Sequence, residues 1–394
     1  MLANGWKEIS LGEVLTLQRG FDLPYRRRQP GSTPIVSSSG ISDKHSQAMV
    51  SGPGVVTGRY GTIGQVFFIN EDFWPLNTTL FVRDFKGNDP LFISFLLRTI
   101  DFQSYSGKTG VPGVNRNDLH QEIVKLPPLP EQRAIAEVLS DVDALITALD
   151  RLIAKKRAIK QGAMQQLLTG QTRLPGFSGM TGYKQTKVGV IPKDWEAKRI
   201  GELFEVTSSK RVFQSEWKTK GVPFYRAREL AVLGEQGFVE NELFISREMY
   251  DAYKNAHGVP KVGDILVTGV GTLGKVHIVS DDHEFYFKDG NIIWFKSSGR
   301  ASSDYVRQLY LTQLVIRQIE NASAGTTVGT YTISGAKETI IPFPPLPEQR
   351  AIATVLSDMD AELAALEARR EKTHVLKQGM MQELLTGRIR LVRE

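Results

Sequence analysis

The chain has 394 residues, of which 41% are hydrophobic and 23% are charged. That composition is typical of a globular protein and excludes a disordered chain, and the length suggests two or three domains. Lysine and arginine exceed aspartate and glutamate by 49 to 43, so the mild basic excess permits an anionic partner such as nucleic acid without establishing one.

Other function classes are excluded by what the sequence lacks. Cysteine is absent, which excludes disulfides, cysteine-based zinc sites and thiol nucleophiles. The sequence has no apolar run of about 18 residues and no signal-peptide core at its start, so we expect a cytoplasmic protein without a membrane partner.

The first segment, residues 1–125, is predicted to be a mixed α/β domain. Short β-rich runs occur at 55–56, 65–69 and 79–82, glycine turns flank the first two, and residues 91–100 are helix-like. No regular alternation of strand and helix occurs, so we expect a twisted sheet with a few helices.

The second segment, residues 126–175, is predicted to be one long helix. It begins after rigid prolines with Glu131 in the first turn, where a carboxylate favours the helix dipole, and Gly170 is a natural stop. Apolar residues at helical steps define a coiled-coil seam, and additional ones widen the apolar face. The seam and the wider face comprise Ile135, Leu139, Val142, Leu145, Ile146, Leu149 and Leu152, with Val138, Ile153 and Ile159.

The third segment, residues 176–342, resembles the first only faintly. Trp6 and Trp195 both precede a Gly-Glu pair, and strands are predicted at 265–268, 275–279 and 292–295, with a helical stretch at 303–320. The fourth segment, 343–394, repeats the long helix: about 30 of 48 positions in 127–174 and 344–391 are identical at a constant offset of 217. Its seam is Ile352, Leu356, Met359, Leu363 and Leu366, and Glu348 and Gly387 occupy the positions of Glu131 and Gly170.

The organisation is therefore variable–constant–variable–constant. Each long helix could run about 39 residues, or roughly 58 Å. The simplest partner for each apolar stripe is the other copy in the same chain. Two interpretations stay open: the pair merely holds the halves together, or the wider face of the first helix also binds an outside partner. Gly162 and Gly379 interrupt both helices, which indicates close packing or a bend.

Motifs for catalysis are scarce. Gly269, Gly271 and Gly274 match a dinucleotide fingerprint, but a strand rather than a helix is predicted next, which favours a glycine hairpin that brings backbone close to a phosphate. Asp194, Glu216 and Lys218 are compatible with a Mg²⁺ nuclease pattern, although the first half has no equivalent. The histidines show no metal-ligand spacing, and we expect no metal site.

Cationic side chains near glycine loops are the candidates for contact with DNA. Arginine can read guanine bidentately and can neutralise phosphate. Each cluster alone could instead be a solvated surface. The candidates are Arg26, Arg27, Arg59, Tyr60, Lys108 and Arg116 in the first half, and Lys210, Arg211, Arg226, Arg228, Thr272 and Lys275 in the second.

The repeated run PPLPEQRAIA…VLSD…KQG…LLTG, with a variable domain before each copy, resembles the specificity subunit of type I restriction-modification systems. The resemblance covers the whole chain, and the helical repeats carry it. It implies an α+β fold in which two mixed α/β target-recognition domains are separated by two antiparallel coiled-coil helices, with pseudo-twofold symmetry. One departure from some relatives is that the chain starts directly at Trp6, without a preceding piece of the helix.

The resemblance also implies a function. Each recognition domain would read one half of a bipartite, asymmetric target in double-stranded DNA, and the helices would set the spacing. The chain itself would be non-catalytic and would recruit two methyltransferase subunits that use S-adenosylmethionine. Two motor-nuclease subunits that use ATP and Mg²⁺ are also implied. Two alternatives from other classes are a self-contained DNA enzyme built on the Asp194 pattern and a coiled-coil scaffold without a nucleic-acid role.

Overall fold

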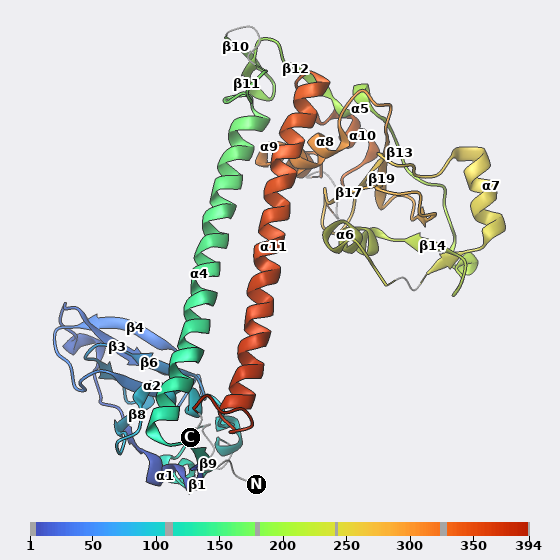
Figure 1. Ribbon diagram of the computed structural model, residues 1–394. Coiled ribbons are helices and arrows are strands. Elements are labelled where there is room, and N and C mark those ends of the chain that lie inside the picture. The colour runs from blue at the N-terminus through green and yellow to red at the C-terminus, as the bar shows by residue number, and fades with distance from the viewer. Residues whose placement is uncertain (1–4, 107–112, 178–181, 241–242, 324–328, 393–394) are drawn as a thin grey trace. The chain divides into compact units, whose positions relative to one another are not determined.

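The computed structural model describes residues 5–106, 113–177, 182–240, 243–323 and 329–392. The chain forms two compact units, one of residues 1–152 with 366–394 and the other of residues 153–365. Each unit holds one variable domain together with a part of both long helices (Figure 1).

The variable domain of the first unit is built on a four-stranded antiparallel sheet. The order in this sheet is β2 (Thr16–Arg19), β8 (Thr79–Asp84), β5 (Gly54–Gly58), β6 (Val66–Ile69). A smaller sheet has the order β4 (Gly40–His45), β3 (Thr33–Ser37), β7 (Trp74–Pro75), and β1 (Lys7–Ser10) pairs with β9 (Ile123–Leu126). The helical elements are α1 (Leu11–Val14), η1 (Tyr25–Arg27), α2 (Pro90–Leu97), η2 (Phe102–Tyr105) and α3 (Arg116–Leu119).

Strand β5 and helix α2 form the centre of this domain because almost all of their residues are buried. Every residue of β5 is buried, and Asp89 caps α2 by accepting the Phe92 amide. The same core includes Ile135 and Leu139 of the first long helix and Leu384 and Leu385 of the second. The variable domain and the helix ends are therefore packed as one body within this unit.

The second unit repeats this topology strand for strand. Its main sheet has the order β13 (Glu205–Thr207), β19 (Ile292–Lys296), β16 (Ile265–Thr268), β17 (Val276–Ile278). The smaller sheet has the order β15 (Phe244–Ile245), β14 (Val222–Tyr225), β18 (Tyr286–Phe287), and β12 (Glu196–Arg199) pairs with β20 (Ile340–Phe343). The faint sequence similarity of the two variable segments thus reflects one shared fold.

Further elements distinguish the second unit. It has a hairpin of β10 (Tyr183–Thr186) and β11 (Gly189–Pro192), and the helical elements α5 (Ile200–Leu203), η3 (Gln214–Glu216), α6 (Ala227–Gln236), α7 (Arg247–His257), α8 (Ser303–Tyr310), α9 (Gln313–Ser323) and α10 (Ile333–Glu338). Helices α6 and α7 lie between β14 and β16 in the chain and were not anticipated from the sequence. The helix expected at 303–320 is two helices, because the chain turns at Leu311 and Thr312.

The predicted strands at 55–56, 65–69, 79–82, 265–268, 275–279 and 292–295 each overlap an observed strand, and 65–69 and 275–279 extend one residue beyond it, the latter at both ends. The glycine run that begins at Gly269 leads into β17, so the strand expected after it is confirmed. Gly271 and Gly274 adopt φ of 72° and 74°, which is the conformation that favours glycine in a tight turn.

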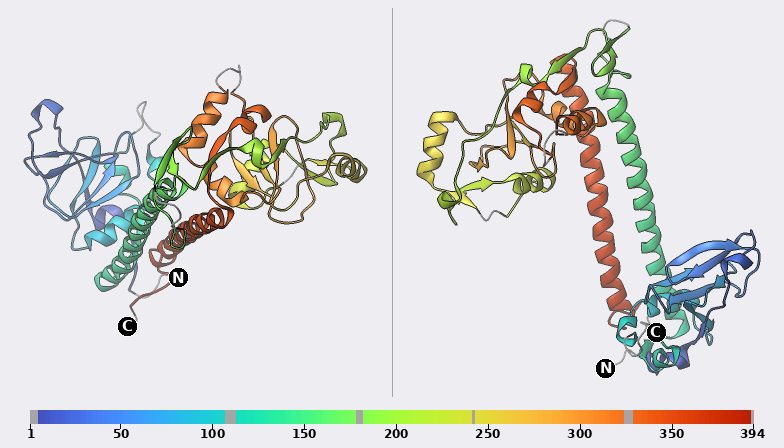
Figure 2. Two further views of the ribbon diagram at one scale, coloured as in Figure 1. Left: turned by 90° about the horizontal axis from the view of Figure 1, so that it is seen from above. Right: turned by 180° about the vertical axis from the view of Figure 1, so that it is seen from behind.

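The two constant segments are the helices α4 (Leu129–Leu168) and α11 (Leu346–Leu384), of 40 and 39 residues. They lie side by side in the views of Figure 2. Both helices end before a glycine of positive φ, Gly170 at 70° and Gly387 at 73°, as expected. A side chain built at Gly162 or Gly379 would meet no atom within 4 Å, so close packing does not explain these glycines. Within the described residues, no helix is long and apolar enough to cross a membrane.

The helices run antiparallel in both units. In the first unit, Lys377 contacts Asp143 at 2.6 Å and Arg370 contacts Asp150 at 3.2 Å. In the second unit, Lys156 contacts Glu362 at 2.6 Å and Lys160 pairs with Asp360. The 217-residue offset converts Asp143 and Lys377 into Asp360 and Lys160, so the same ion pair occurs twice, as pseudo-twofold symmetry requires.

Candidate nucleic-acid interface and helix anchors

The first anchor joins the first variable domain to both helices through a buried carboxylate. Glu131, in the first turn of α4, is 1% exposed. It accepts a hydrogen bond from the Trp6 indole at 3.0 Å and one from Nε of Arg390, beyond the end of α11, at 2.6 Å. Gln132 adds to the joint, because it accepts the Asp89 amide at 3.0 Å.

The second unit holds the equivalent anchor. Glu348 is fully buried and accepts the Trp195 indole at 3.0 Å. Arg173 donates to both Glu348 oxygens, at 2.5 and 2.7 Å, and to both oxygens of Asp194, at 3.0 and 3.1 Å. The pKa of Asp194 is lowered by these bonds, whereas partial burial opposes it. Burial would lower the pKa of Arg173, but its hydrogen bonds to the two carboxylates raise it.

From the sequence, Glu131 and Glu348 were expected only to favour the helix dipole, and the anchors themselves were not predicted. A signal was nevertheless present, because Glu131 and Arg173 have repeat equivalents, Glu348 and Arg390, at the common offset of 217. The anchors position each variable domain on the ends of the helix pair, so they fix the surfaces that carry the candidate contacts.

The turn η1 presents the first cluster of candidates. Arg26 and Arg27 are exposed, while the neighbouring Arg28 donates to Asp43 of β4 at 2.9 Å and is thereby held on the small sheet. Tyr25, which the sequence analysis missed, is 81% exposed beside them. An exposed aromatic ring with exposed arginines next to it in the chain is suited to contact with a nucleic acid backbone and its bases.

The glycine loop after β5 brings Arg59 and Tyr60 together. The Arg59 guanidinium lies 4.6 Å from the centre of the Tyr60 ring, and the Arg59 carbonyl accepts the Val114 amide. Arg116, exposed on α3, follows two residues later, so these candidates belong to one region of the domain. Lys108 lies outside the described residues.

In the second domain, several predicted cations are already engaged. Arg226 caps α6 and donates to buried Glu229 at 3.0 and 2.5 Å, and Arg211 donates to Asp289 at 3.1 Å. Burial opposes ionisation of Glu229, but the Arg226 hydrogen bonds outweigh it and lower its pKa. Any DNA contact by Arg226 would therefore compete with an internal ion pair.

The remaining predicted contacts of this domain are exposed. They are Lys210, Arg228, Thr272 and Lys275. Thr272 and Lys275 occupy the glycine turn after β16, where Thr268 accepts the Lys275 amide at 3.0 Å and donates to the Thr272 carbonyl. These backbone-fixed positions are the counterpart of the Arg59 loop in the first domain.

The predicted helix residues divide into a buried seam and an exposed stripe. Ile135, Leu139, Ile146 and Leu149 of α4 and Ile352, Leu356 and Leu363 of α11 are buried, and Val142, Met359 and Leu366 are half-buried. Leu145 and Leu152 are 40% and 38% exposed, so the apolar face of α4 is wider than the seam that α11 covers.

The nuclease-like pattern is not assembled. Asp194 is held by Arg173, whereas Glu216 accepts the Phe213 amide at the start of η3. The backbone of Lys218 bridges to Phe244. In the part of the chain that the structure describes, no group of three or more His, Cys, Asp or Glu side chains is placed to hold a metal ion.

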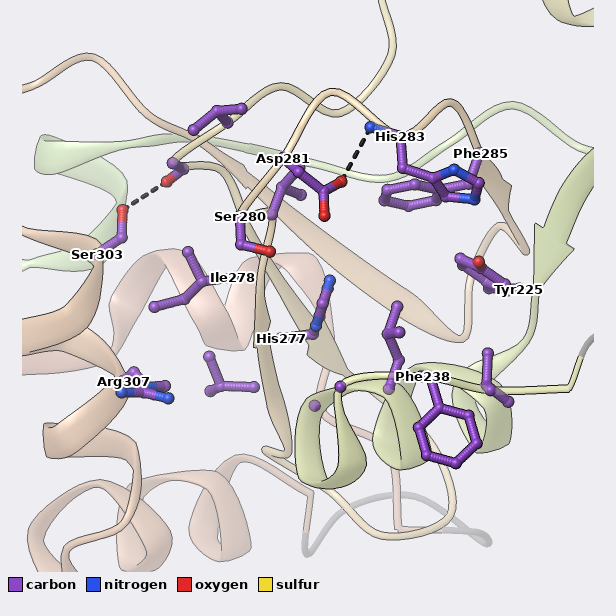
Figure 3. A pocket seen from close by; sticks show the side chains of 18 of the residues that line it. Tyr225, Phe238, His277, Ile278, Ser280, Asp281, His283, Phe285, Ser303 and Arg307 are labelled. Atoms are coloured by element: carbon purple, nitrogen blue, oxygen red, sulfur yellow. Dashed lines mark hydrogen bonds between the residues drawn. The ribbon is translucent and has the colours of Figure 1, made fainter. Parts of the chain in front are cut away.

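A cavity of about 780 Å³ lies in the second domain between β17, the following loop, α6 and α8 (Figure 3). Burial lowers the pKa of His277, which lines it. Asp281 accepts the His283 amide at 2.9 Å and so stabilises the loop. Tyr225, Phe238 and Phe285 supply aromatic walls. This lining can accommodate a side chain or a planar ring, but no described hydrogen bond links His277 to Ser280 or Asp281 as an activated nucleophile would require.

Comparison with known families identifies the chain. The family described as "Type I restriction modification DNA specificity domain" matches residues 3–161 and 192–376. The chain belongs to this family of type I restriction-modification specificity subunits. It is 28% identical over 311 residues to the type I restriction enzyme MjaVIII specificity subunit of Methanocaldococcus jannaschii, covering 76% of this chain and 70% of the relative. It is 23% identical to a putative type I specificity subunit of Haemophilus influenzae, covering 90% and 87%.

Solved specificity subunits share the fold. The crystal structure of the type I S subunit from M. genitalium superposes with a TM-score of 0.64 over 98% of each chain, at 15% identity. A second structure, described in terms of complex assembly and conformational transition of the type I restriction-modification system, gives a TM-score of 0.54 at 19% identity. The expected architecture of two recognition domains on two long helices is therefore confirmed.

Proposed function

We propose that this specificity subunit is non-catalytic and that each variable domain reads one half of a bipartite, asymmetric DNA sequence. The observation that carries the proposal is that the two variable domains share one fold but differ in their exposed residues. Between the first strand of the main sheet and the first strand of the small sheet, the first domain has Tyr25-Arg26-Arg27 and the second has Gln214-Ser215-Glu216. Equivalent positions with opposite charge favour different half-sites.

The helix pair would set the distance between the half-sites. Ion pairs in both units fix its register, and each variable domain is bonded to helix ends through a buried glutamate. A stiff spacer that holds two readers is suited to two half-sites at a defined separation.

The exposed stripe of α4 would dock a partner. Leu145 and Leu152 are seven residues apart and lie on one face of the helix. They can therefore pack between the side chains of a second helix, as in a coiled coil. Two methyltransferase subunits would supply S-adenosylmethionine-dependent chemistry, and two motor-nuclease subunits would supply ATP- and Mg²⁺-dependent cleavage. In this proposal the specificity subunit itself holds no cofactor.

Methylome sequencing of the host with the gene intact and deleted tests the proposal. Loss of one bipartite methyladenine motif on deletion, restored by the gene in trans, is the expected result and would give both half-sites. If the motif set is unchanged although the partner methyltransferase is expressed, the proposal fails. Mg²⁺-dependent cleavage by the purified chain alone would favour a self-contained enzyme instead.

A further inference from the structure

A second, smaller cavity of about 150 Å³ lies in the second variable domain, away from the glycine turn. It is formed where β13 ends, beside β18, β19 and the last turn of α7. Its lining includes Ser208, Ser209, Lys210, Tyr286, Trp294 and Lys296. Apart from the indole and one glycine, every lining side chain is a hydroxyl or a basic nitrogen group.

The base of the cavity holds a buried donor. Tyr286 is 1% exposed, and its hydroxyl oxygen accepts the Lys210 amide at 2.8 Å. Among the described contacts, the proton of this hydroxyl has no acceptor. An acceptor inside the cavity can therefore take this proton while the hydroxyl oxygen keeps the Lys210 amide. Burial raises the pKa of Tyr286 to about 12, so the hydroxyl keeps its proton near neutral pH.

Two ammonium groups stand at this cavity. The Lys210 side chain is exposed and has no carboxylate partner among the described residues. Lys296 lies 4.7 Å from the Trp294 ring centre and contacts Glu205 at 2.6 Å. Because the Glu205 side chain is 68% exposed, this ion pair contributes little to stability, so Lys296 can exchange Glu205 for another anion.

The hydroxyls of the lining are fixed by the surrounding strands. Ser208 donates to the Ile292 carbonyl at 2.7 Å, and Ser209 donates to the Phe287 carbonyl at 2.6 Å. These bonds hold the segment that carries Lys210 against β18 and β19. The cavity is therefore shaped by the fold rather than by mobile surface side chains.

We propose that this cavity binds a phosphate group, with the Tyr286 hydroxyl donating to one oxygen and Lys210 and Lys296 neutralising its charge. A DNA backbone phosphodiester and a free phosphate share this chemistry. In the first domain, the corresponding segment after β2 carries the apolar Phe21 and no lysine. The Phe21 ring centre lies 5.8 Å from that of Phe81 and 6.5 Å from that of Trp74. We therefore assign the site to the second domain. Its DNA form rests on the proposed function, whereas its free-phosphate form does not.

The first arm of the test uses inorganic phosphate and the full-length chain. Phosphate is titrated against chloride at equal ionic strength and followed by ³¹P line broadening. Saturable binding that weakens about tenfold in Lys210→Ala is expected, since hydrogen bonds to charged groups carry such an effect. Tyr286→Phe should act similarly, but it also removes the acceptor of the Lys210 amide, so Lys210→Ala is the decisive variant. Lys220→Ala, an exposed lysine in the same domain, is the matched control.

The second arm uses the complex with its methyltransferase and target duplexes that carry one neutral methylphosphonate at successive positions. A methylphosphonate at one position in a single half-site should lower the DNA affinity of the wild type about tenfold. The same methylphosphonate should not change the DNA affinity of Lys210→Ala. If the chain binds phosphate and one methylphosphonate position weakens DNA binding, the natural ligand is a DNA backbone phosphodiester. If the chain binds phosphate but no methylphosphonate position weakens DNA binding, the natural ligand is a free phosphate. Absence of both overturns the proposal. If the wild type binds no DNA at all, the proposed function fails while the phosphate titration still decides the site.

Discussion

Replacing Arg390 by alanine should open the first unit locally, because it leaves a buried carboxylate without its cation. The Arg390 side chain is 26% exposed and that of Glu131 is 2% exposed. After the change, the Trp6 indole would still donate to Glu131 at 3.0 Å. The indole is neutral and cannot replace the lost charge.

The magnitude follows from the burial of the two partners. Breaking a fully buried ion pair costs about 3–5 kcal/mol. Because Arg390 is about one quarter exposed, water can enter its place, and we expect about 2–3 kcal/mol. This corresponds to a roughly 30- to 150-fold increase in the opening equilibrium of the first unit. Arg173→Ala should cost more in the second unit, because Arg173 serves two carboxylates.

Hydrogen exchange measured by mass spectrometry separates the two units, which a single melting curve cannot do. Peptides around Trp6 and Glu131 should lose protection in Arg390→Ala, while peptides around Trp195 keep it. Arg388→Ala is the control, since its side chain is 56% exposed in its pair with Glu383, and we expect less than about 1 kcal/mol.

Adding Glu131→Gln to Arg390→Ala tests the charge argument directly. The neutral amide still accepts the indole proton and costs less to bury, so protection should recover by more than half. The reasoning is refuted if Arg390→Ala leaves exchange unchanged, or if the second substitution lowers protection further.

Further predictions concern the second anchor and the proposed function. The lowered pKa of Asp194 stabilises the native state above about pH 4 and the gain is lost as pH falls below it, so Asp194→Asn should flatten this part of a urea-stability profile. Arg59→Ala should relax one half of the methylation motif, and a change in both halves would contradict the assignment. Leu149→Asp with Leu366→Asp should abolish copurification of the methyltransferase. Deleting seven residues from each helix should shorten the spacer by about 10.5 Å, roughly three base pairs, in the methylome.

The fold was predictable where its signal is periodic or repeated. The apolar steps from Ile135 to Leu149 identify α4 because a long helix keeps one face buried over many turns, and the 217-residue repeat identifies α11. Six β-rich runs marked strands, and glycine bounds five of them. Helices α6 and α7, of 10 and 11 residues, were not predicted, because each has an apolar pattern over only about three turns and no repeat equivalent.

The candidate sites were less predictable, because exposure of a cation depends on tertiary neighbours. Nothing in the sequence distinguishes Arg226 and Arg211 from the other basic residues. In the fold, Arg226 forms an ion pair with Glu229 and Arg211 forms one with Asp289. The anchors could not be paired by spacing either, since Trp6 lies 125 residues and Arg390 lies 259 residues from Glu131. Tyr286 belongs to no sequence motif, because only the fold brings its hydroxyl next to the backbone of Lys210.

The repeated anchors explain how the recognition surfaces can differ while the frame stays constant. Buried ion pairs add little net stability compared with apolar packing, but they fix one geometry because a misplaced charge is costly. Glu131 and Glu348 each impose that geometry within their own unit. The residues between the strands carry no such constraint. Equivalent turns of the two domains can therefore have different sequences, Tyr25-Arg26-Arg27 in the first and Gln214-Ser215-Glu216 in the second. Different half-site preferences therefore require no change in the helices.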